Sequence, residues 1–411
     1  MIKSQGNAGN FVDTLSGLSK GDTSFTVSDG SLIQKGDMLG LVEDTGGLVT
    51  SNWAVNTLGQ MLRVDSVADD TVFFQNPLRM SYIDSLNPRI RIADPTEYTG
   101  VECLKVTRKD STSNQTSNLY YKYARNCHIK GVESYKCNFT HVEIFKSSNL
   151  EVTGSYFHHA FGYGGGGQAY GVTLHFTSGE CLITNNIFKH LRHSMLMQAG
   201  SNGNVLAYNY SADPYWDQSF LPENSAGDLV LHGNYPYANL FEGNIVQNVV
   251  VDNSHDLNGP FNTFFRNRAE LYGLFMNSSP ATDSLNFVGF EITDNSNGQY
   301  KIEGSGHFKH GNNVNGTIDP SGTNTLSDTS YYRDEKPVYW RNGISWHSVG
   351  IPNELDSGTI PAERRFRNGD ILTVCDVNEL ESDTDSVNSV NDIENNAAKA
   401  IAIYPNPNRG K

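Results

Sequence analysis

The middle of the chain repeats one short pattern: NCHIKG (126–131), NLEVTG (149–154), CLITNN (181–186), NVLAYN (204–209), NLFEGN (239–244), NTFFRN (262–267) and NFVGFE (286–291). In six of the seven segments, Asn or Gly stands five residues after the start. The starts are 23, 32, 23, 35, 23 and 24 residues apart, so the period is about 23 with insertions of 9 and 12 residues. A fixed period of this length predicts units that stack on one another.

We interpret the period as one turn of a right-handed parallel β-helix, which makes the fold class all-β. Successive turns of such a coil lie ~4.8 Å apart, so equivalent positions form columns in which Asn side chains hydrogen-bond to their neighbours. The competing leucine-rich repeat is disfavoured because its Leu-x-x-Leu-x-Leu frame is absent. Alternating apolar residues predict a second inward-facing strand in each turn: Val142/Ile144, Val172/Leu174/Phe176 and Met195/Met197.

Composition agrees with a β-rich globular protein. The 411 residues are 37% hydrophobic and 18% charged, and 39 glycines indicate frequent tight turns. The net charge of −15 argues against nucleic acid as a partner. No apolar run approaches the ~18 residues that a transmembrane segment needs. The five cysteines are too few and too scattered to indicate a disulfide framework.

The sequence divides into four expected parts. Residues 1–85 read as short alternating strands between Gly and Asp turns, and we expect a small β unit that caps the coil. Residues 86–375 form the β-helix with its loop insertions, beginning with an early turn near 101–106. Its less periodic part, 295–375, is expected to pack along the coil or to cap its other end. Residues 376–399 read as an acidic, solvated linker, and 400–411 as the start of another domain.

A polar column indicates the candidate active site. Four consecutive repeats carry His158, His190, Asp213 and Asn248 nine residues after their starts, with Tyr135 in the repeat before them, so stacking is expected to bring these side chains together. Lys189, Arg192 and His193 add titratable groups nearby. A histidine is a general base near neutral pH, and a cation stabilises developing negative charge. We take His190 and Arg192 as the first catalytic candidates, with His158 and Asp213 beside them.

Two insertions follow this column and predict binding loops. The first contains four consecutive glycines between Tyr163 and Tyr170, and the second contains Tyr215 and Trp216. Aromatic rings of this kind stack against sugar rings, whose faces present C–H groups. We therefore expect these four side chains, together with Lys189 and His193, to bind substrate.

Further candidates lie beyond the column. His232 is either a catalytic group or a hydrogen-bonded core histidine, and Arg266 is expected to contact substrate. Asp252, His255 and Asp256 could bind Ca²⁺, although a turn closed by Asp side-chain bonding is the favoured interpretation. The metal content is otherwise left open. Asp213, Asp217, Glu223 and Asp228 keep a glycoside hydrolase with paired carboxylates possible.

The repeat from Asn126 to about Asp294 resembles the pectate-lyase-like superfamily of parallel β-helix proteins, which act on carbohydrates. The resemblance implies a polysaccharide-degrading enzyme, and the His and Arg candidates favour a lyase that cleaves a uronic-acid polymer by β-elimination. A hydrolase and a non-catalytic glycan-binding or adhesin β-helix are the alternatives. The Asn-Thr-Asp, Asp-Asp and Gly-His-Gly set of polygalacturonases and a pectate-lyase Ca²⁺ cluster are not found, so no family residue is transferred.

The last segment, Ala400–Lys411, contains Tyr-Pro-Asn-Pro followed by Gly. It resembles the first strand of the C-terminal sorting domain of the type IX secretion system. This resemblance implies export across both membranes of a Bacteroidetes-type cell, with the secretion machinery as a partner. We expect a secreted or cell-surface protein whose sequence stops within the sorting domain.

Overall fold

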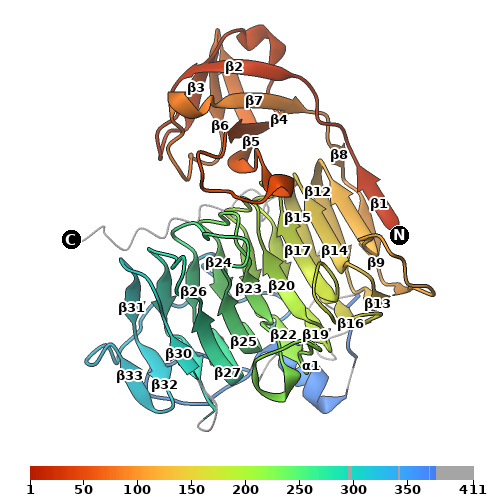
Figure 1. Ribbon diagram of the computed structural model, residues 1–411, viewed down its shortest axis with the longest axis vertical. Helices are drawn as coiled ribbons and strands as arrows, with labels where there is room; N and C mark the ends of the chain where they lie inside the picture. The colour runs from red at the N-terminus through yellow and green to blue at the C-terminus, as the bar shows by residue number, and fades with distance from the viewer. Residues whose placement is uncertain (295–298, 341–342, 370, 376–411) are drawn as a thin grey trace.

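The computed structural model describes residues 1–294, 299–340, 343–369 and 371–375. It is a right-handed parallel β-helix, as predicted, and the expected small N-terminal β unit is an antiparallel barrel (Figure 1). The expected acidic linker and sorting-domain segment, 376–411, lie outside the described residues. In the described part, no helix is long and apolar enough to cross a membrane.

Each turn of the coil contributes one strand to each of three faces. The first face is a parallel sheet that contains the repeated pattern. Its strands are β8 (Thr96–Glu97), β9 (Gly100–Glu102), β12 (Ala124–Lys130), β15 (Ser148–Thr153), β18 (Leu182–Thr184), β21 (Val205–Ala207), β24 (Leu240–Glu242), β26 (Thr263–Phe265), β28 (Asn286–Val288) and β31 (Phe308–His310). The β9 strand pairs with β12, which confirms the predicted early turn near 101–106.

The second and third faces form one folded sheet, because the long strands β25 (Ile245–Val251) and β27 (Arg268–Met276) belong to both. The second face also contains β10 (Lys105–Thr107), β13 (Glu133–Cys137), β16 (Tyr156–Ala160), β19 (Ile187–Lys189), β22 (Tyr210–Ala212), β29 (Glu291–Ile292), β32 (Asn312–Val314) and the antiparallel β33 (Thr317–Asp319). The third face contains β1 (Ile2–Gln5), β11 (Leu119–Lys122), β14 (Thr140–Phe145), β17 (Tyr170–His175), β20 (His193–Met197), β23 (Leu229–Leu231) and β30 (Gln299–Lys301).

The observed register differs from the predicted one by a single residue in two places. Val152 lies opposite Ile183, and Thr263 lies opposite Asn286, so the spacings there are 31 and 23 rather than 32 and 24. The prediction aligned every Asn, but Asn149 lies at a corner with φ of 56°, beside the corner residue Glu180. Asparagine favours both left-handed corners and buried ladders, so residue identity alone did not separate the two positions.

Two buried asparagine ladders hold the turns in register. In the first, Asn204 donates through Nδ2 to Asn239 Oδ1 at 3.0 Å, and Asn239 donates to Asn262 at 2.9 Å. The second ladder runs through Asn186, Asn209, Asn244 and Asn267 with the same geometry. Each Oδ1 also accepts a backbone N–H from the turn before it, for example from Asn186 N to Asn209. Buried backbone groups at the corners are thereby satisfied.

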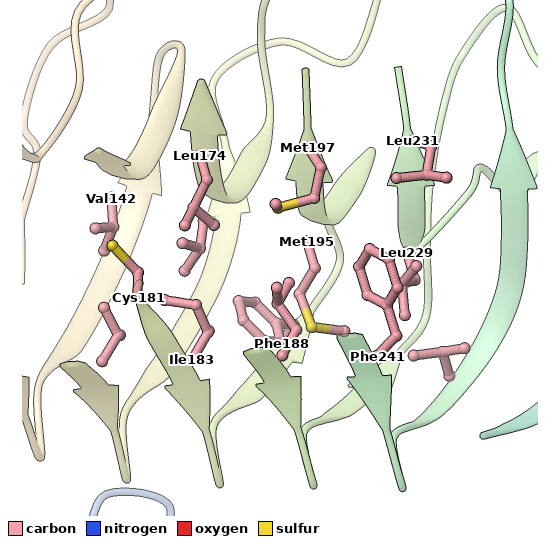
Figure 2. Close-up of a cluster of buried hydrophobic side chains, with 14 of the residues drawn as sticks. Val142, Leu174, Cys181, Ile183, Phe188, Met195, Met197, Leu229, Leu231 and Phe241 are labelled. Carbon is pink, nitrogen blue, oxygen red and sulfur yellow. The ribbon is translucent and has the colours of Figure 1, made fainter. Parts of the chain in front are cut away.

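The core fills the inside of the coil. The predicted inward residues Val142, Leu174, Met195 and Met197 are fully buried and meet Ile183, Phe188 and Phe241 from the other faces (Figure 2). The inward prediction for Phe176 is wrong. It has φ of 53° at the corner, and its ring contacts Trp53 at 5.8 Å between centroids.

The N-terminal unit is a closed barrel of β2 (Phe11–Ser16), β3 (Ser24–Val27), β6 (Thr71–Phe74), β5 (Leu58–Ala68), β4 (Met38–Glu43) and β7 (Arg89–Ala93). The preceding strand β1 pairs with β11 and belongs to the coil. The barrel contacts the corner between the third and first faces, where Thr177 and Tyr237 donate to the carbonyls of Thr57 and Gly59 at 2.8 and 2.7 Å. Short 3-10 segments span Gly30–Leu32, Asn52–Ala54, Asp84–Leu86 and Pro222–Asn224.

The C-terminal part of the described chain packs along the coil, which was one of the two expectations for it. The helix α1 (Pro361–Asn368) lies against β19 and β22, and Arg365 donates to the backbone and side-chain oxygens of Asn185. Tyr339 hydrogen-bonds to Thr184 at 2.6 Å, and Val374 N donates to Gly154 O at 2.7 Å. This segment therefore covers the corner between the first and second faces.

Candidate functional site

The two predicted insertions stand at one corner of the coil, between the second and third faces. The first loop, 161–169, joins β16 to β17, and the second, 213–228, joins β22 to β23. They touch each other, because Asp217 N donates to Tyr163 O at 3.2 Å. The chain therefore gathers both predicted insertions beside the polar column.

A group of five polar side chains, Glu133, His158, His159, His190 and Asp213, forms what we call the corner cluster. The register places His158 opposite Tyr135 and Lys189, so His158 does not share a column with His190. This corrects the predicted column, which carried the one-residue slip between the second and third repeats. The ring of His159 lies beside that of His190 instead, tilted by 36° with 5.1 Å between the centroids.

Hydrogen bonds within the corner cluster define its protonation. Glu133 accepts from Lys105 at 2.6 Å and from His158 Nε2 at 3.1 Å. The Nδ1 atoms of His158 and His159 lie 3.0 Å apart, so His159 is the donor in that bond when His158 is protonated on Nε2. Burial lowers the pKa of His158 to about 4 and also lowers the pKa of His159. Burial acts to raise the pKa of Glu133, but the bonds from Lys105 and His158 hold it below its ordinary value.

His190 and Asp213 form the most accessible pair of the corner cluster. His190 Nδ1 lies 2.9 Å from Asp213 Oδ2, and the two side chains are 27% and 57% exposed. Because a carboxylate only accepts, Nδ1 carries the proton and Nε2 of a neutral His190 keeps its lone pair. The pair therefore has the composition of a general base held in one tautomer.

The predicted tyrosines surround this pair. The Tyr215 ring stacks on the His190 imidazole at 5.1 Å and 13°, and the Tyr163 ring meets its edge at 4.9 Å. Tyr163 accepts from Ala160 N at 2.8 Å and donates to His190 O at 3.2 Å. Burial raises the pKa of Tyr163, so its hydroxyl stays neutral. Tyr163 therefore fixes the backbone of His190.

The nearby cations have different roles. Lys136 and Lys189 lie close enough for their charges to lower the pKa of His159, after the larger effect of burial. Arg192 is buried and donates to Gly164 O at 3.2 Å and to Gly166 O, with its guanidinium 4.7 Å from the Trp216 ring centre. The catalytic candidate Arg192 thus holds the glycine loop, while the lysines supply charge beside the corner cluster.

A second polar group, the sheet cluster, lies on the outside of the third face and contains His193, His232, Asp252 and His255. The rings of His193 and His232 are 5.5 Å apart, and those of His232 and His255 are 5.0 Å apart. His232 Nε2 approaches Asp252 Oδ2 at 3.6 Å, and His193 Nδ1 bonds to Gly227 O at 2.8 Å. Burial lowers the pKa of both histidines, so they are neutral at pH 7.

The same face continues toward the N-terminal end of the coil. His175 Nε2 bonds to Glu143 Oε1 at 3.1 Å, and Gln198 contacts His175 Nδ1 at 3.3 Å. The predicted binding residue Tyr170 lies between the loop and this face, 5.1 Å from the His193 ring. A series of mostly buried polar side chains therefore extends across the third face.

The predicted binding residue Arg266 joins neither cluster. Arg266 is buried at the corner between the first and second faces, where it donates to Asp328 O at 2.9 Å and to Leu326 O at 3.2 Å. The segment after the coil covers it, which the sequence did not indicate. Asp252 accepts from Ser254 N at 2.9 Å, which is the favoured Asp-closed turn. Within the described residues, no group of three or more His, Cys, Asp or Glu is arranged to hold a metal ion.

Sequence reasoning missed Glu133 and Glu143, although each binds a histidine of the site. Glu133 stands two residues before Tyr135, so both side chains leave the strand on the same face. Reading outward positions in steps of two along each strand would have identified it. Ser134 and His141, which bond to each other beneath the corner cluster at 2.8 Å, have inward positions with no such signal.

Comparisons with known proteins identify the fold. The tailspike protein gp49 of Pseudomonas phage LKA1 aligns with a TM-score of 0.53 and 12% identity, over 71% of this chain and 48% of its own. The tailspike gp61 of Pseudomonas phage phi297 aligns with a TM-score of 0.52 and 14% identity, over 76% and 48%. The chain thus spans about half the length of these tailspikes. No family model and no curated protein matches the chain.

Proposed function

We propose that the protein is a secreted polysaccharide lyase that cleaves a uronic-acid-containing polymer by β-elimination at the corner cluster. The observation that carries this proposal is the part-exposed His190–Asp213 pair, with Nδ1 and Oδ2 2.9 Å apart, beside the aromatic rings of Tyr163 and Tyr215. A base held in one tautomer, aromatic surface for a sugar ring and nearby lysines are the parts that this reaction requires.

The proposed chemistry uses these groups in one sequence. Lys136 and Lys189 attract the uronate carboxylate and stabilise the negative charge that develops when the C5 proton leaves. His190 Nε2 takes that proton while Asp213 stabilises the resulting imidazolium. The C5–H electron pair forms the C4–C5 double bond, the C4–O bond breaks, and the departing oxygen takes a proton from water. The His190 imidazolium returns the C5 proton to the hydroxide that is left, which regenerates the base. The products are an unsaturated uronate end and a hydroxyl end.

Two of the four carboxyl groups considered for a hydrolase, Asp213 and Asp228, already have partners within the protein. An inverting hydrolase needs two accessible carboxyl groups ~6.5–9.5 Å apart. Asp228 is fully buried and accepts from Ser211, Gln247 N and Asn248 N, so it supports the loop rather than meeting substrate. Burial raises its pKa to about 6. Asp213 accepts a hydrogen bond from His190 Nδ1. Hydrolysis and glycan binding without cleavage remain outcomes that the experiment below distinguishes.

We infer export from the Tyr404-Pro405-Asn406-Pro407 segment, which supports type IX secretion and an extracellular place of action. Fusing residues 376–411 to a reporter tests only whether this segment is sufficient for export. The direct measurement is the location of the full-length protein in cells with and without a functional type IX system. Retention inside the cell in both strains contradicts the inference.

The activity experiment is a screen of alginate, pectin and other uronans with the purified full chain. The proposal predicts new ultraviolet absorbance at the unsaturated-uronate band, growing together with new reducing ends. Reducing ends without that absorbance identify a hydrolase. Retention of a glycan on an affinity gel without cleavage identifies a binding protein.

The His190→Ala variant tests the assigned base. It is expected to lose about 10²- to 10⁴-fold in rate, the usual contribution of general base catalysis. A matched control is His310→Ala, which removes a histidine whose Nε2 bonds to the carbonyl of Thr325 in the last turns of the coil. Equal activity of the two variants would remove His190 from the mechanism.

A further inference from the structure

A cavity of about 280 Å³ lies between the barrel and the coil, at the opposite end of the third face from the corner cluster. Phe11, Arg89 and Arg91 line it from the barrel strands, and Tyr123 and Lys146 from the coil. Its volume is several times the ~30 Å³ of one water molecule, and it approaches the ~300–1,000 Å³ of small-molecule sites. The cavity is thus large enough for a sugar ring and much larger than a bare inorganic ion.

The charged side chains that line the cavity are all cationic. Arg89 is paired with Asp44 at 2.8 Å, whereas Arg91 donates to Gly9 O at 2.9 Å and Lys146 lies beside Phe145. Among the described residues, no Asp or Glu lines the cavity, and neither Arg91 nor Lys146 forms a salt bridge. Burial lowers the pKa of Lys146, and the charges of Arg91 and Lys122 lower it further. Part-buried cations without a counter-charge are costly, and an anion would stabilise them.

The other lining groups fit a sugar. The Arg91 guanidinium lies 3.9 Å from the centre of the Phe11 ring, so charge and aromatic surface are presented together. Val42, Val55 and Met61 supply apolar wall. A carboxylate on a ring with C–H faces meets both kinds of surface, whereas phosphate or sulfate alone would leave the apolar wall without a partner.

The cavity is aligned with the corner cluster across the third face. Lys146 follows the end of β14 and Thr177 follows the end of β17, while the corner cluster precedes the start of β17. Strand β17 has 6 residues, which at ~3.3 Å each separate the two places by about 20 Å. The outward residues between them include Glu143, His175 and Gln198. One extended polysaccharide chain is able to reach both places.

We propose that this cavity binds a carboxylate-bearing sugar unit of the polysaccharide, away from the cleavage position. The inference rests on the proposed function for the identity of the polymer. The barrel then helps to hold the substrate, and the affinity of the protein for a polysaccharide depends on the length of that polysaccharide. Oligomers long enough to reach from the corner cluster to the cavity bind more tightly than shorter ones.

Calorimetry on the full chain carrying His190→Ala tests the proposal without turnover. The ligands are oligogalacturonates and oligoalginates of increasing length, with glucose oligomers of equal length as the neutral series. The Arg91→Gln/Lys146→Gln variant is expected to weaken binding of the long acidic oligomers at least about tenfold, which corresponds to ~1.4 kcal/mol. The control Lys35→Gln/Arg63→Gln removes the same charge from exposed barrel positions and should leave affinity unchanged.

A second variant distinguishes a loss of binding from a loss of folding. Asn56 lines the cavity and accepts from Arg89 at 3.2 Å, so Asn56→Asp adds a carboxylate where a partner already exists. It should keep the melting temperature and lose acidic-oligomer binding. The proposal is overturned if both variants bind as the parent does, if no acidic oligomer binds, or if inorganic phosphate competes at equal affinity. If wild-type protein cuts no uronan but the variants still lose binding, the lyase proposal fails and the cavity proposal stands.

Discussion

Replacing Asn209 with alanine tests how the coil aligns its candidate base. Asn186 and Asn209 are neighbours in the second asparagine ladder, and each stands directly before a strand that ends at the corner cluster. His190 follows β19, and Asp213 follows β22. The hydrogen bonds between the two asparagines therefore fix the register that brings His190 against Asp213. We expect Asn209→Ala to lower both the free energy of unfolding and the activity.

The magnitude follows from the hydrogen bonds of this side chain, which is fully buried. Its Oδ1 accepts from the backbone and side-chain nitrogens of Asn186, both at 3.0 Å. Its Nδ2 donates to Ile183 O at 2.8 Å and to Asn244 Oδ1 at 3.0 Å. Alanine leaves the buried Asn186 N–H without this acceptor, which costs ~1–3 kcal/mol, and the other lost bonds add ~1 kcal/mol each. Because the surrounding structure relaxes in part, we expect the free energy of unfolding to fall by about 3–5 kcal/mol.

The assay is urea unfolding followed by circular dichroism, with the turnover rate measured on the folded variant. Asn149→Gly is the control, because Asn149 occupies a left-handed corner outside the ladders, where glycine is tolerated. It should change the free energy of unfolding by less than about 1 kcal/mol. If the two variants are equally stable, the ladder does not hold the register and the reasoning is refuted.

Three further predictions concern the site. Asp213→Asn should lower the rate about 10²- to 10⁴-fold with an unchanged melting temperature, because the amide no longer holds the proton on His190 Nδ1 and the position is exposed; an unchanged rate contradicts the assignment. Arg192→Gln should speed hydrogen exchange in residues 161–169 about tenfold, because Gly164 O and Gly166 O lose a charged donor; unchanged exchange would show that the loop is held otherwise. Burial lowers the pKa of His141 in the folded protein to about 3, whereas in the unfolded chain it keeps its ordinary value of about 6.5. As the pH falls below about 6.5, the unfolded chain binds a proton that the folded protein does not, so the free energy of unfolding decreases. At pH 5 this loss is about 2 kcal/mol, and His141→Gln should flatten the pH dependence of urea unfolding.

The fold could be predicted because the coil repeats its physical requirements every turn. Val142, Val172 and Met195 fill the same interior position in successive turns, so their period is visible in the sequence. The Asn signal was equally clear, but it mixed corner residues such as Asn149 with ladder residues such as Asn204. One slip of register moves each side chain to another position, and this separated His158 from the predicted column.

The site was predicted less completely, because its environment depends on segments distant in sequence. His190, Asp213 and Tyr215 were predicted together and do meet. Arg266 is buried because it bonds to the carbonyls of Leu326, Asp328 and Gly350, which are distant in sequence. Arg192 is held by its bonds to the glycine loop. Neither contact has a period or a local pattern. The cavity beneath Arg91 likewise exists only because the barrel packs on the coil.

The central claim is that elimination, rather than hydrolysis, occurs at His190. Mass spectrometry of the products formed from a uronic-acid oligomer of defined length measures this directly. Elimination at His190 predicts that one product from each cut is lighter by one water molecule than the hydrolysis product, and that His190→Ala makes almost none of it. Products that contain the added water, or unchanged formation of the lighter product by His190→Ala, would contradict the account.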